Sequence, residues 1–323
     1  MGWSFQPEKL RFLSICAAVM LLLPMTAVLV RGNNSAPEVS ENSGDTSVYR
    51  VYDIRADTVI SVPVREYLIG AVAAEMPASY EPEALKAQVI ASHTYAERIR
   101  MQNLASTDDT LHGADFSNDS TQYQAYLTDE ELHALWGNDF ARNYAKITDA
   151  VDAVGDLILC YDGEPIVAAF HAVSAGQTFS AGWVWGAELP YLVSVDSEFD
   201  KKSAQYESVT EVTADTLRKA IEKALPDVTL PDNESEWIVK SGTAVTIGNV
   251  TVTCVQLREV LSLPSPCLQW AYDSARETFI FTTYGCGHNV GMSQFGANEM
   301  ARTGSTCEAI LAHYYPAASL RNT

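Results

Sequence analysis

The strongest constraint on how this chain can fold is an uncharged segment near its start. Residues 12–30, FLSICAAVMLLLPMTAVLV, contain no acidic or basic side chain. As a helix they would extend roughly 28 Å, about the thickness of a bilayer's hydrocarbon core. Lys9 and Arg11 precede the segment and favour a cytoplasmic tail over residues 1–11. We therefore expect a single-pass transmembrane anchor at the cell membrane and an extracytoplasmic domain; the alternative is a cleaved signal peptide.

Composition and charge limit the possible partners. The chain has 41 acidic against 21 basic residues, a formal net charge of −20. A protein this acidic repels polyanions, so we expect no nucleic-acid partner. Cys16 lies in the apolar segment, and the remaining cysteines are odd in number and form no C-x-x-C motif. The sequence leaves open whether Cys286 and Cys307 form a bridge or remain free thiols.

The rest of the chain has the pattern of one α+β domain. Residues 31–48 are polar and aperiodic, which is typical of a flexible linker. From 49 to 323, strand and helix patterns are interspersed without a regular β-α-β order, which favours an α+β class. Helices are predicted over 63–75 and 81–103, and apolar runs on both sides of Asp162-Gly163 predict a hairpin.

Glu75 has an unusual setting at the end of the first predicted helix. That helix can begin at Pro63, because proline is well tolerated in a first turn. Leu68, Ala71, Val72 and Glu75 then share one stripe, and only the last is polar. Burial and the helix C-terminus both raise the pKa of a carboxyl, as a general acid requires. The plain alternative is a glutamate at the edge of the stripe that reaches solvent.

A glycine-rich stretch near the C-terminus is a second candidate. In YGCGHNVGMSQFGA, residues 284–297, the glycines allow the backbone to approach a ligand closely. His288 and Gln294 offer hydrogen-bonding groups there. The alternative is a tight turn that packs against the core.

A third candidate follows an apolar run. His171 and Ser174 come after that run and precede Trp183 and Trp185, aromatic side chains of a kind that suits sugar faces. The alternative is an ordinary polar turn beside core tryptophans.

Other chemistries find little support in the motifs. No G-x-S-x-G elbow occurs, which argues against a serine hydrolase. The six histidines show no H-x-x-x-H or H-E-x-x-H spacing, so we predict no metal. A glycosidase with two facing carboxylates would need a second acid as distinctive as Glu75.

Several blocks, taken in order, resemble the SpoIID/LytB family. The resemblance covers about residues 49–321, and its blocks are 62–96, 131–137, 163–178, 189–203 and 284–301. It implies a peptidoglycan lytic transglycosylase that cleaves MurNAc–GlcNAc bonds in glycan strands without stem peptides. It also implies a role in forespore engulfment during sporulation, with the amidase/endopeptidase SpoIIP and the scaffold SpoIIM as partners and no cofactor.

The family's catalytic glutamate falls on Glu75. The implied mechanism is protonation of the glycosidic oxygen by Glu75, followed by attack of the MurNAc 6-hydroxyl on C1 to leave a 1,6-anhydro end. One carboxyl suffices because the nucleophile belongs to the substrate. The expected substrate-binding residues are His93, His171, Ser174, Lys201, His288 and Gln294.

Three departures from the family pattern bear on these expectations. His93 occupies a position that is arginine in many relatives, so a role that needs positive charge would depend on pH. Ser117, Gln122 and Tyr123 stand where zinc-binding relatives have thiolates or imidazole, which predicts no zinc. The serine-rich run after FH is reduced to AVSAG. A non-catalytic glycan-binding enhancer of a cell-wall amidase is therefore the alternative function.

Overall fold

The computed structural model describes residues 48–105, 108–241 and 244–323. The predicted tail, the anchor at 12–30 and nearly all of the linker lie outside these residues. Within them, no helix is long and apolar enough to cross a bilayer. Helices and mainly antiparallel sheets alternate along the described chain, which confirms the mixed α+β class.

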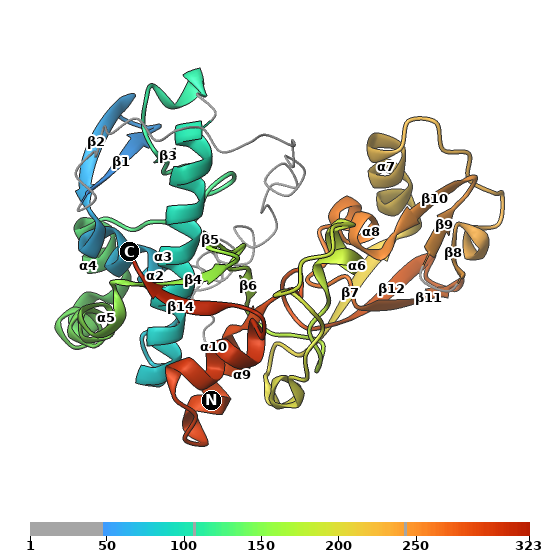
Figure 1. Cartoon of the computed structure of the whole chain (residues 1–323). Helices are drawn as coiled ribbons and strands as arrows, with labels where there is room; N and C mark the ends of the chain where they lie inside the picture. The colour runs from blue at the N-terminus through green and yellow to red at the C-terminus, as the bar shows by residue number, and fades with distance from the viewer. Residues whose placement is uncertain (1–47, 106–107, 242–243) are drawn as a thin grey trace.

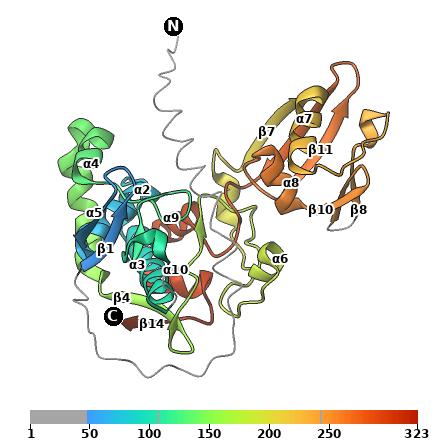
Figure 2. The same ribbon diagram turned by 90° about the horizontal axis from the view of Figure 1, so that it is seen from above.

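The described residues form two lobes with separate hydrophobic cores (Figure 1). A helical lobe comprises residues 48–206 and 285–323, and a sheet lobe comprises residues 207–284, inserted between its two parts. Figure 2 shows the same separation from above. Periodicity alone did not separate these two cores.

The helical lobe is built around one long helix. Its α-helices are α2 (Val64–Glu75), α3 (Pro82–Ala105), α4 (Asp129–Trp136), α5 (Phe140–Val154), α6 (Ala181–Trp185), α9 (Gln294–Arg302) and α10 (Cys307–Tyr314). Its 3₁₀ turns are η2 (Asp109–Leu111), η3 (Gly137–Asp139) and η4 (Glu198–Lys202). Helix α3 contacts α2, α5, α9 and α10. It begins at Pro82 with Glu83 in its first turn, where proline and an acid are both favourable.

Helix α2 confirms the predicted helix over 63–75 to within one residue. Leu68, Ala71, Val72 and Glu75 are all buried, so the predicted stripe faces the core. The helix ends at Glu75, and Met76 is extended because the residue before Pro77 avoids the helical region. The glutamate is therefore held at the buried end of the helix.

Residues 129–154 form two α-helices, α4 and α5, joined by a short 3₁₀ turn. Gly137 has a φ of 47° and separates α4 from α5 through η3. Glycine adopts this left-handed conformation without steric cost.

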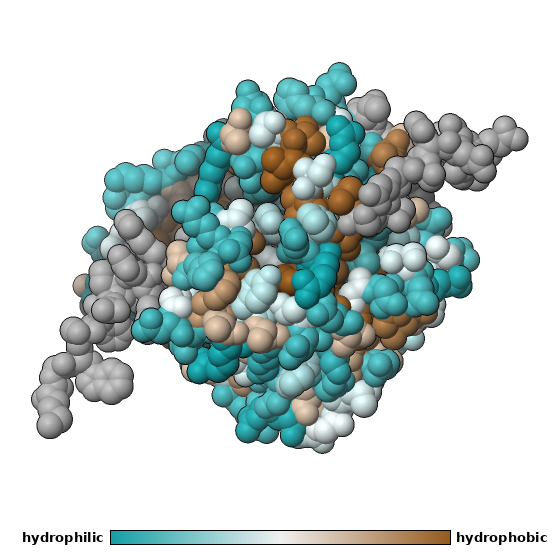
Figure 3. Space-filling view, turned by 90° about the vertical axis from the view of Figure 1, so that its left-hand side faces the viewer, coloured by the Kyte–Doolittle hydropathy of each residue, from teal (hydrophilic) through white to brown (hydrophobic). Residues whose placement is uncertain are grey.

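The face in Figure 3, seen from the left of Figure 1, is largely hydrophilic with separate hydrophobic patches, as the acidic composition leads one to expect.

Short strands complete the helical lobe. They are β1 (Val48–Asp53), β2 (Thr58–Pro63), β3 (Phe116–Ser117), β4 (Leu157–Tyr161), β5 (Glu164–Pro165), β6 (Phe170–His171), β13 (Met292–Ser293) and β14 (Ser319–Asn322). Asp162 and Gly163 both have positive φ between β4 and β5, which confirms the predicted turn. Strands β6 and β13 pair in parallel with His171 opposite Ser293. This pairing joins two of the candidate stretches.

The sheet lobe contains two three-stranded sheets, β11-β12-β7 and β10-β9-β8. Its elements are β7 (Glu207–Thr213), α7 (Ala214–Ala224), η5 (Glu234–Glu236), β8 (Ile238–Ser241), β9 (Ala244–Ile247), β10 (Val250–Thr253), α8 (Cys254–Leu261), β11 (Leu268–Asp273) and β12 (Thr278–Tyr284). Strand β12 leads directly into the glycine-rich stretch of the helical lobe.

Candidate active site

Glu75 is a buried acid with a strongly perturbed pKa. Only 8% of the residue is exposed, and loss of hydration raises its pKa to about 7. The backbone N–H of Ala125 donates to the carboxylate and opposes this rise. Burial raises the pKa of the Tyr67 and Tyr95 hydroxyls, and the nearby charge of Glu75 adds to the rise. The setting agrees with the expectation of an acid that holds its proton near neutral pH.

Gln294 links the glycine-rich stretch to Glu75. It is the first residue of α9, and its Nε2 donates to the Glu75 carbonyl oxygen at 3.0 Å. The same Nε2 donates to Gln88 Oε1 of α3 at 3.2 Å. Two stretches that the sequence analysis treated separately therefore meet at the end of α2.

A chain of buried polar side chains continues from this point. Gln88 Nε2 donates to Ser92 Oγ at 3.1 Å, and Gln124 Nε2 donates to the same oxygen at 2.6 Å. Gln124 immediately precedes Ala125, so the chain helps to position the N–H that reaches Glu75. Gln124 Oε1 is buried and has no partner among the described residues. Gln88 and Gln124 were not among the predicted site residues, although a glutamine four residues before Ser92 on a buried helix face is a detectable signal.

Gly70 allows the segment that carries Ala125 to approach α2. The N–H of Leu127 donates to the Gly70 carbonyl at 3.3 Å. A Cβ at Gly70 would collide with the Leu127 carbonyl oxygen and would lie 2.7 Å from two ring carbons of Tyr126. The close approach of this segment therefore requires glycine at position 70.

His171 and His288 lie together, with ring centroids 5.6 Å apart. Both rings contact the backbone of Val290. His171 Nδ1 lies 3.1 Å from the Val290 carbonyl oxygen, and the Val290 N–H donates to His288 Nδ1 at 3.1 Å. Burial lowers the pKa of His171 to about 4 and that of His288 well below its ordinary value. Trp185 packs beside His288 at 5.6 Å between ring centroids.

Ser174 is held by an acid that the sequence analysis missed. Asp200 is fully buried, and its Oδ2 accepts a hydrogen bond of 3.0 Å from the Ser174 N–H. Its Oδ1 accepts from Ser293 Oγ at 2.8 Å, and Ser293 in turn caps the N-terminus of α9. Burial raises the pKa of Asp200, while these hydrogen bonds oppose the rise. Asp200 lies in block 189–203, one of those that resemble the family, but no local pattern marks it as buried.

Lys201 is exposed next to this buried acid. Its Nζ lies 2.7 Å from Glu198, and its side chain packs over Gly176. A Cβ at Gly176 would lie 2.7 Å from Lys201 Cε. Substrate binding by Lys201 stays a prediction.

His93 faces a different side of α3 from Gln88 and Ser92. Its Nε2 lies 3.9 Å from Glu97, and its Nδ1 is buried without a partner in the described chain. Burial lowers the pKa of His93, which favours the neutral ring. The expected role of a charged His93 in substrate binding stays a prediction.

The stretch aligned with the zinc-binding relatives makes local contacts. Ser117 Oγ accepts from the Asp119 N–H at 3.2 Å, and Gln122 Nε2 donates to Asp119 Oδ2 at 3.1 Å. Tyr123 packs near Phe116. Among residues 48–105, 108–241 and 244–323, no three His, Cys, Asp or Glu side chains are grouped to hold a metal ion. The five cysteines of this part are all free.

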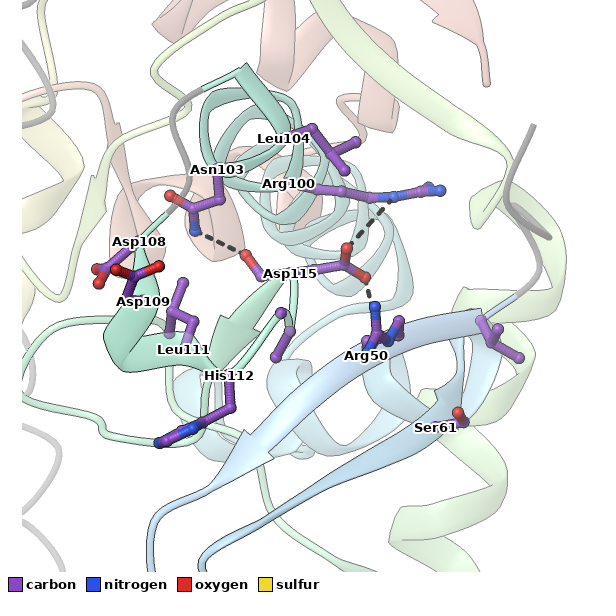
Figure 4. A pocket seen from close by; sticks show the side chains of 13 residues that line it. Arg50, Ser61, Arg100, Asn103, Leu104, Asp108, Asp109, Leu111, His112 and Asp115 are labelled. Carbon is purple, nitrogen blue, oxygen red and sulfur yellow. Dashed lines mark hydrogen bonds and ion pairs between the residues drawn. The ribbon is translucent and has the colours of Figure 1, made fainter. Parts of the chain in front are cut away.

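Two hollows lie away from Glu75. One of about 700 Å³ is formed by β1, β2, the end of α3 and η2 (Figure 4). Asp115 Oδ2 accepts from the Arg50 N–H there at 2.8 Å, and Arg100 lies 4.0 Å from the same carboxylate. The other hollow, of about 450 Å³, is bounded by Phe199, Met300 and Tyr314 among others. Neither is lined by a predicted site residue.

A buried carboxyl with a pKa of about 7 is the kind of group that acid–base chemistry uses. Comparison with known proteins shows the family to which the chain belongs. The family model "Stage II sporulation protein" (SpoIID) matches residues 52–161. The chain is 34% identical to stage II sporulation protein D of Bacillus subtilis (strain 168), over 94% of this chain and 92% of that protein. It is 35% identical to the Bacillus amyloliquefaciens protein of the same name, over 90% and 83%.

The chain therefore belongs to the SpoIID family of stage II sporulation proteins, as the motifs predicted. It is also related, at 24% identity over 78% of its length, to an amidase enhancer of Bacillus subtilis. The chain covers 40% of that longer relative.

Proposed function

We propose that this protein is a peptidoglycan lytic transglycosylase with Glu75 as its catalytic acid and base. The observation that carries the proposal is a buried carboxyl whose pKa is about 7. Such a group is protonated in a large fraction of molecules near neutral pH, and it becomes a competent base after it has given up the proton.

The reaction balances with this one group. Glu75 gives its proton to the oxygen that leaves C1 of MurNAc, and the C1–O bond to GlcNAc breaks. The Glu75 carboxylate then takes the proton of the MurNAc 6-hydroxyl while O6 forms a bond to C1. The products are a GlcNAc 4-hydroxyl and a 1,6-anhydro-MurNAc end, and Glu75 finishes protonated as it began.

The surroundings of Glu75 support a one-carboxylate scheme. The other buried acids among the described residues are Asp115, Asp200 and Glu299. Asp115 accepts from the Arg50 N–H, Asp200 accepts from Ser174 and Ser293, and Glu299 pairs with Arg302 at 2.7 Å. Each of these carboxylates is thus engaged by its own partners, so none is an uncommitted second acid of the kind that common glycosidases use.

The wider setting of the proposal follows the family. We propose substrate strands without stem peptides, action in forespore engulfment, and an extracytoplasmic domain anchored in the cell membrane. The amidase/endopeptidase SpoIIP and the scaffold SpoIIM are the proposed partners.

The alternative is a non-catalytic glycan-binding enhancer of an amidase. The similarity to the amidase enhancer and the presence of His93 in place of the usual arginine favour it. A protein that only binds glycan has no use for an acid with a raised pKa, which is why we prefer the enzyme.

The test uses the full-length protein in detergent and denuded glycan strands, with the products analysed by mass spectrometry. We expect anhydro-MurNAc ends from the parent and from Glu66→Gln, an exposed glutamate on the same helix. We expect none from Glu75→Gln. Reducing ends would show a hydrolase instead, and strands bound without cleavage by any form would favour the enhancer.

A further inference from the structure

Two buried ring nitrogen atoms, one of them on a histidine of the glycine-rich stretch beside Trp185, lack hydrogen-bond partners in the described chain. They are Nε2 of His171 and Nε2 of His288, and neither has a partner in the described part of the chain. Native proteins pair nearly all buried polar atoms, commonly through a water molecule or a ligand. Two orphaned atoms on neighbouring rings therefore point to a shared occupant.

The backbone of Val290 fixes the tautomers of the two rings. Its carbonyl can only accept, so His171 Nδ1 must carry a proton and His171 Nε2 of the neutral ring has a free lone pair. Its N–H can only donate, so His288 Nδ1 must be the acceptor and Nε2 of that neutral ring carries the proton. Turning either ring over would set a C–H against Val290 and lose its hydrogen bond.

The pair thus presents one acceptor and one donor on rings whose centroids are 5.6 Å apart. An oxygen at hydrogen-bond distance from both nitrogens would lie roughly 4 Å from each ring centre. Centroids 5.6 Å apart allow this with an angle of about 90° at the oxygen. A hydroxyl group fits, because it can donate to His171 Nε2 and accept from His288 Nε2–H.

The charges nearby disfavour a cation in this place. A metal ion would need lone pairs on both nitrogens, and the Val290 N–H occupies the one that His288 offers. Arg258 is buried close enough that its positive charge lowers the pKa of both rings. Burial lowers the pKa of His288, and the nearby Phe170 carbonyl opposes this shift, although it makes no hydrogen bond with Nε2.

We propose that His171 and His288 form a two-point site for one neutral hydroxyl group. The hydroxyl belongs either to a buried water molecule or to a sugar of the bound glycan. His288 keeps 6% exposure, and Trp185 beside it is partly exposed on α6. A sugar ring packed on Trp185 could therefore direct a hydroxyl to the pair. This second source rests on the proposed function, whereas the first does not.

Nitrogen NMR of the full-length protein with ¹⁵N-labelled histidine tests the site. We use the Glu75→Gln form so that added denuded strands are not cleaved. We expect Nδ1–H on His171 and Nε2–H on His288. If His288 Nε2–H contacts water and added strands do not change this contact, the hydroxyl belongs to a water molecule. Joint shifts of both Nε2 signals that saturate with the strands support the sugar source.

Two results would overturn the site. One is the same tautomer on both rings, and the other is a His288 Nε2–H that contacts neither water nor glycan. A failed transglycosylase assay would leave the tautomers unaffected, so the two proposals fail separately.

Strand binding gives a second measurement. If the hydroxyl belongs to a sugar of the glycan, His171→Phe and His288→Phe should each weaken strand binding about 5- to 10-fold, as loss of one hydrogen bond does. The double variant should lose less than the product of the single losses, because both rings hold one hydroxyl. His313→Phe is the matched control, since that histidine bonds only the Asp196 carbonyl at 2.7 Å.

Discussion

Gln294 donates a hydrogen bond of 3.0 Å to the carbonyl oxygen of Glu75, which lies 219 positions earlier in the chain. The bond holds the end of α2 against the start of α9. It also satisfies a carbonyl at a helix C-terminus, where no partner within the helix is available. The position of the catalytic candidate therefore depends on a residue from the other end of the domain.

Replacing Gln294 by leucine should impair both stability and cleavage. The change leaves the Glu75 carbonyl and Gln88 Oε1 without their donor, at a cost of about 1–3 kcal/mol for a buried group. We expect a lower urea midpoint and roughly tenfold slower strand cleavage. Gln269→Leu is the control, because that glutamine is exposed and bonds only the Tyr284 hydroxyl. Equal behaviour of the two variants would count against this role.

The pH dependence of cleavage should follow the protonation of Glu75. A general acid must carry its proton when the substrate binds, and burial raises the pKa of this carboxyl to about 7. We expect kcat/KM to be nearly constant below pH 7 and to fall about tenfold per unit well above it. Initial rates on denuded strands from pH 5 to 9 measure this. A rate that rises through pH 7 would assign Glu75 the role of a base alone.

Glu75 should also make stability depend on pH. Its pKa is higher in the folded than in the unfolded state, so the folded protein binds the proton more tightly. The stability that this contributes is complete at low pH and is lost between about pH 4.5 and 7. A shift of this size corresponds to about 3 kcal/mol.

Glu75→Gln should therefore stabilise the protein at pH 8 and change it little at pH 5. Urea unfolding of the parent and the variant at both pH values measures the difference. Glu66→Gln, an exposed change on the same helix, should show no such dependence. The same stability gain at both pH values would argue that Glu75 is not the titrating group.

Gly70→Ala should disturb the site without touching Glu75. The added methyl group collides with the Leu127 carbonyl and the Tyr126 ring, so the segment that carries Ala125 must move. We expect a loss of about 1–3 kcal/mol in unfolding free energy and slower cleavage. In the control Gly182→Ala, the methyl group meets only the flexible end of Glu188. Normal cleavage by Gly70→Ala would show that the Ala125 N–H is dispensable.

Local periodicity predicted the parts of the site that lie on single helices. The i, i+3, i+4, i+7 spacing placed Glu75 on the buried stripe of α2, and a break at Pro77 placed it at the helix end. Each of these features depends on neighbours within two helical turns. The sequence therefore determined that an acid would end the apolar stripe of α2.

Tertiary structure alone decided what surrounds that acid. Gln294 reaches Glu75 from α9, and the backbone of Ala125 reaches it from a loop. His93 is an expected substrate-binding residue, and the rotation of the packed α3 places its Nε2 3.9 Å from Glu97.

The division into two cores and the burial of Asp200 were likewise invisible in the local pattern. Sequence periodicity specifies which face of an element is apolar, because side-chain direction repeats within each element. It does not specify which distant element covers that face, since this depends on packing across the whole chain. The acid was thus determined by the sequence itself, and its partners were decided by the fold.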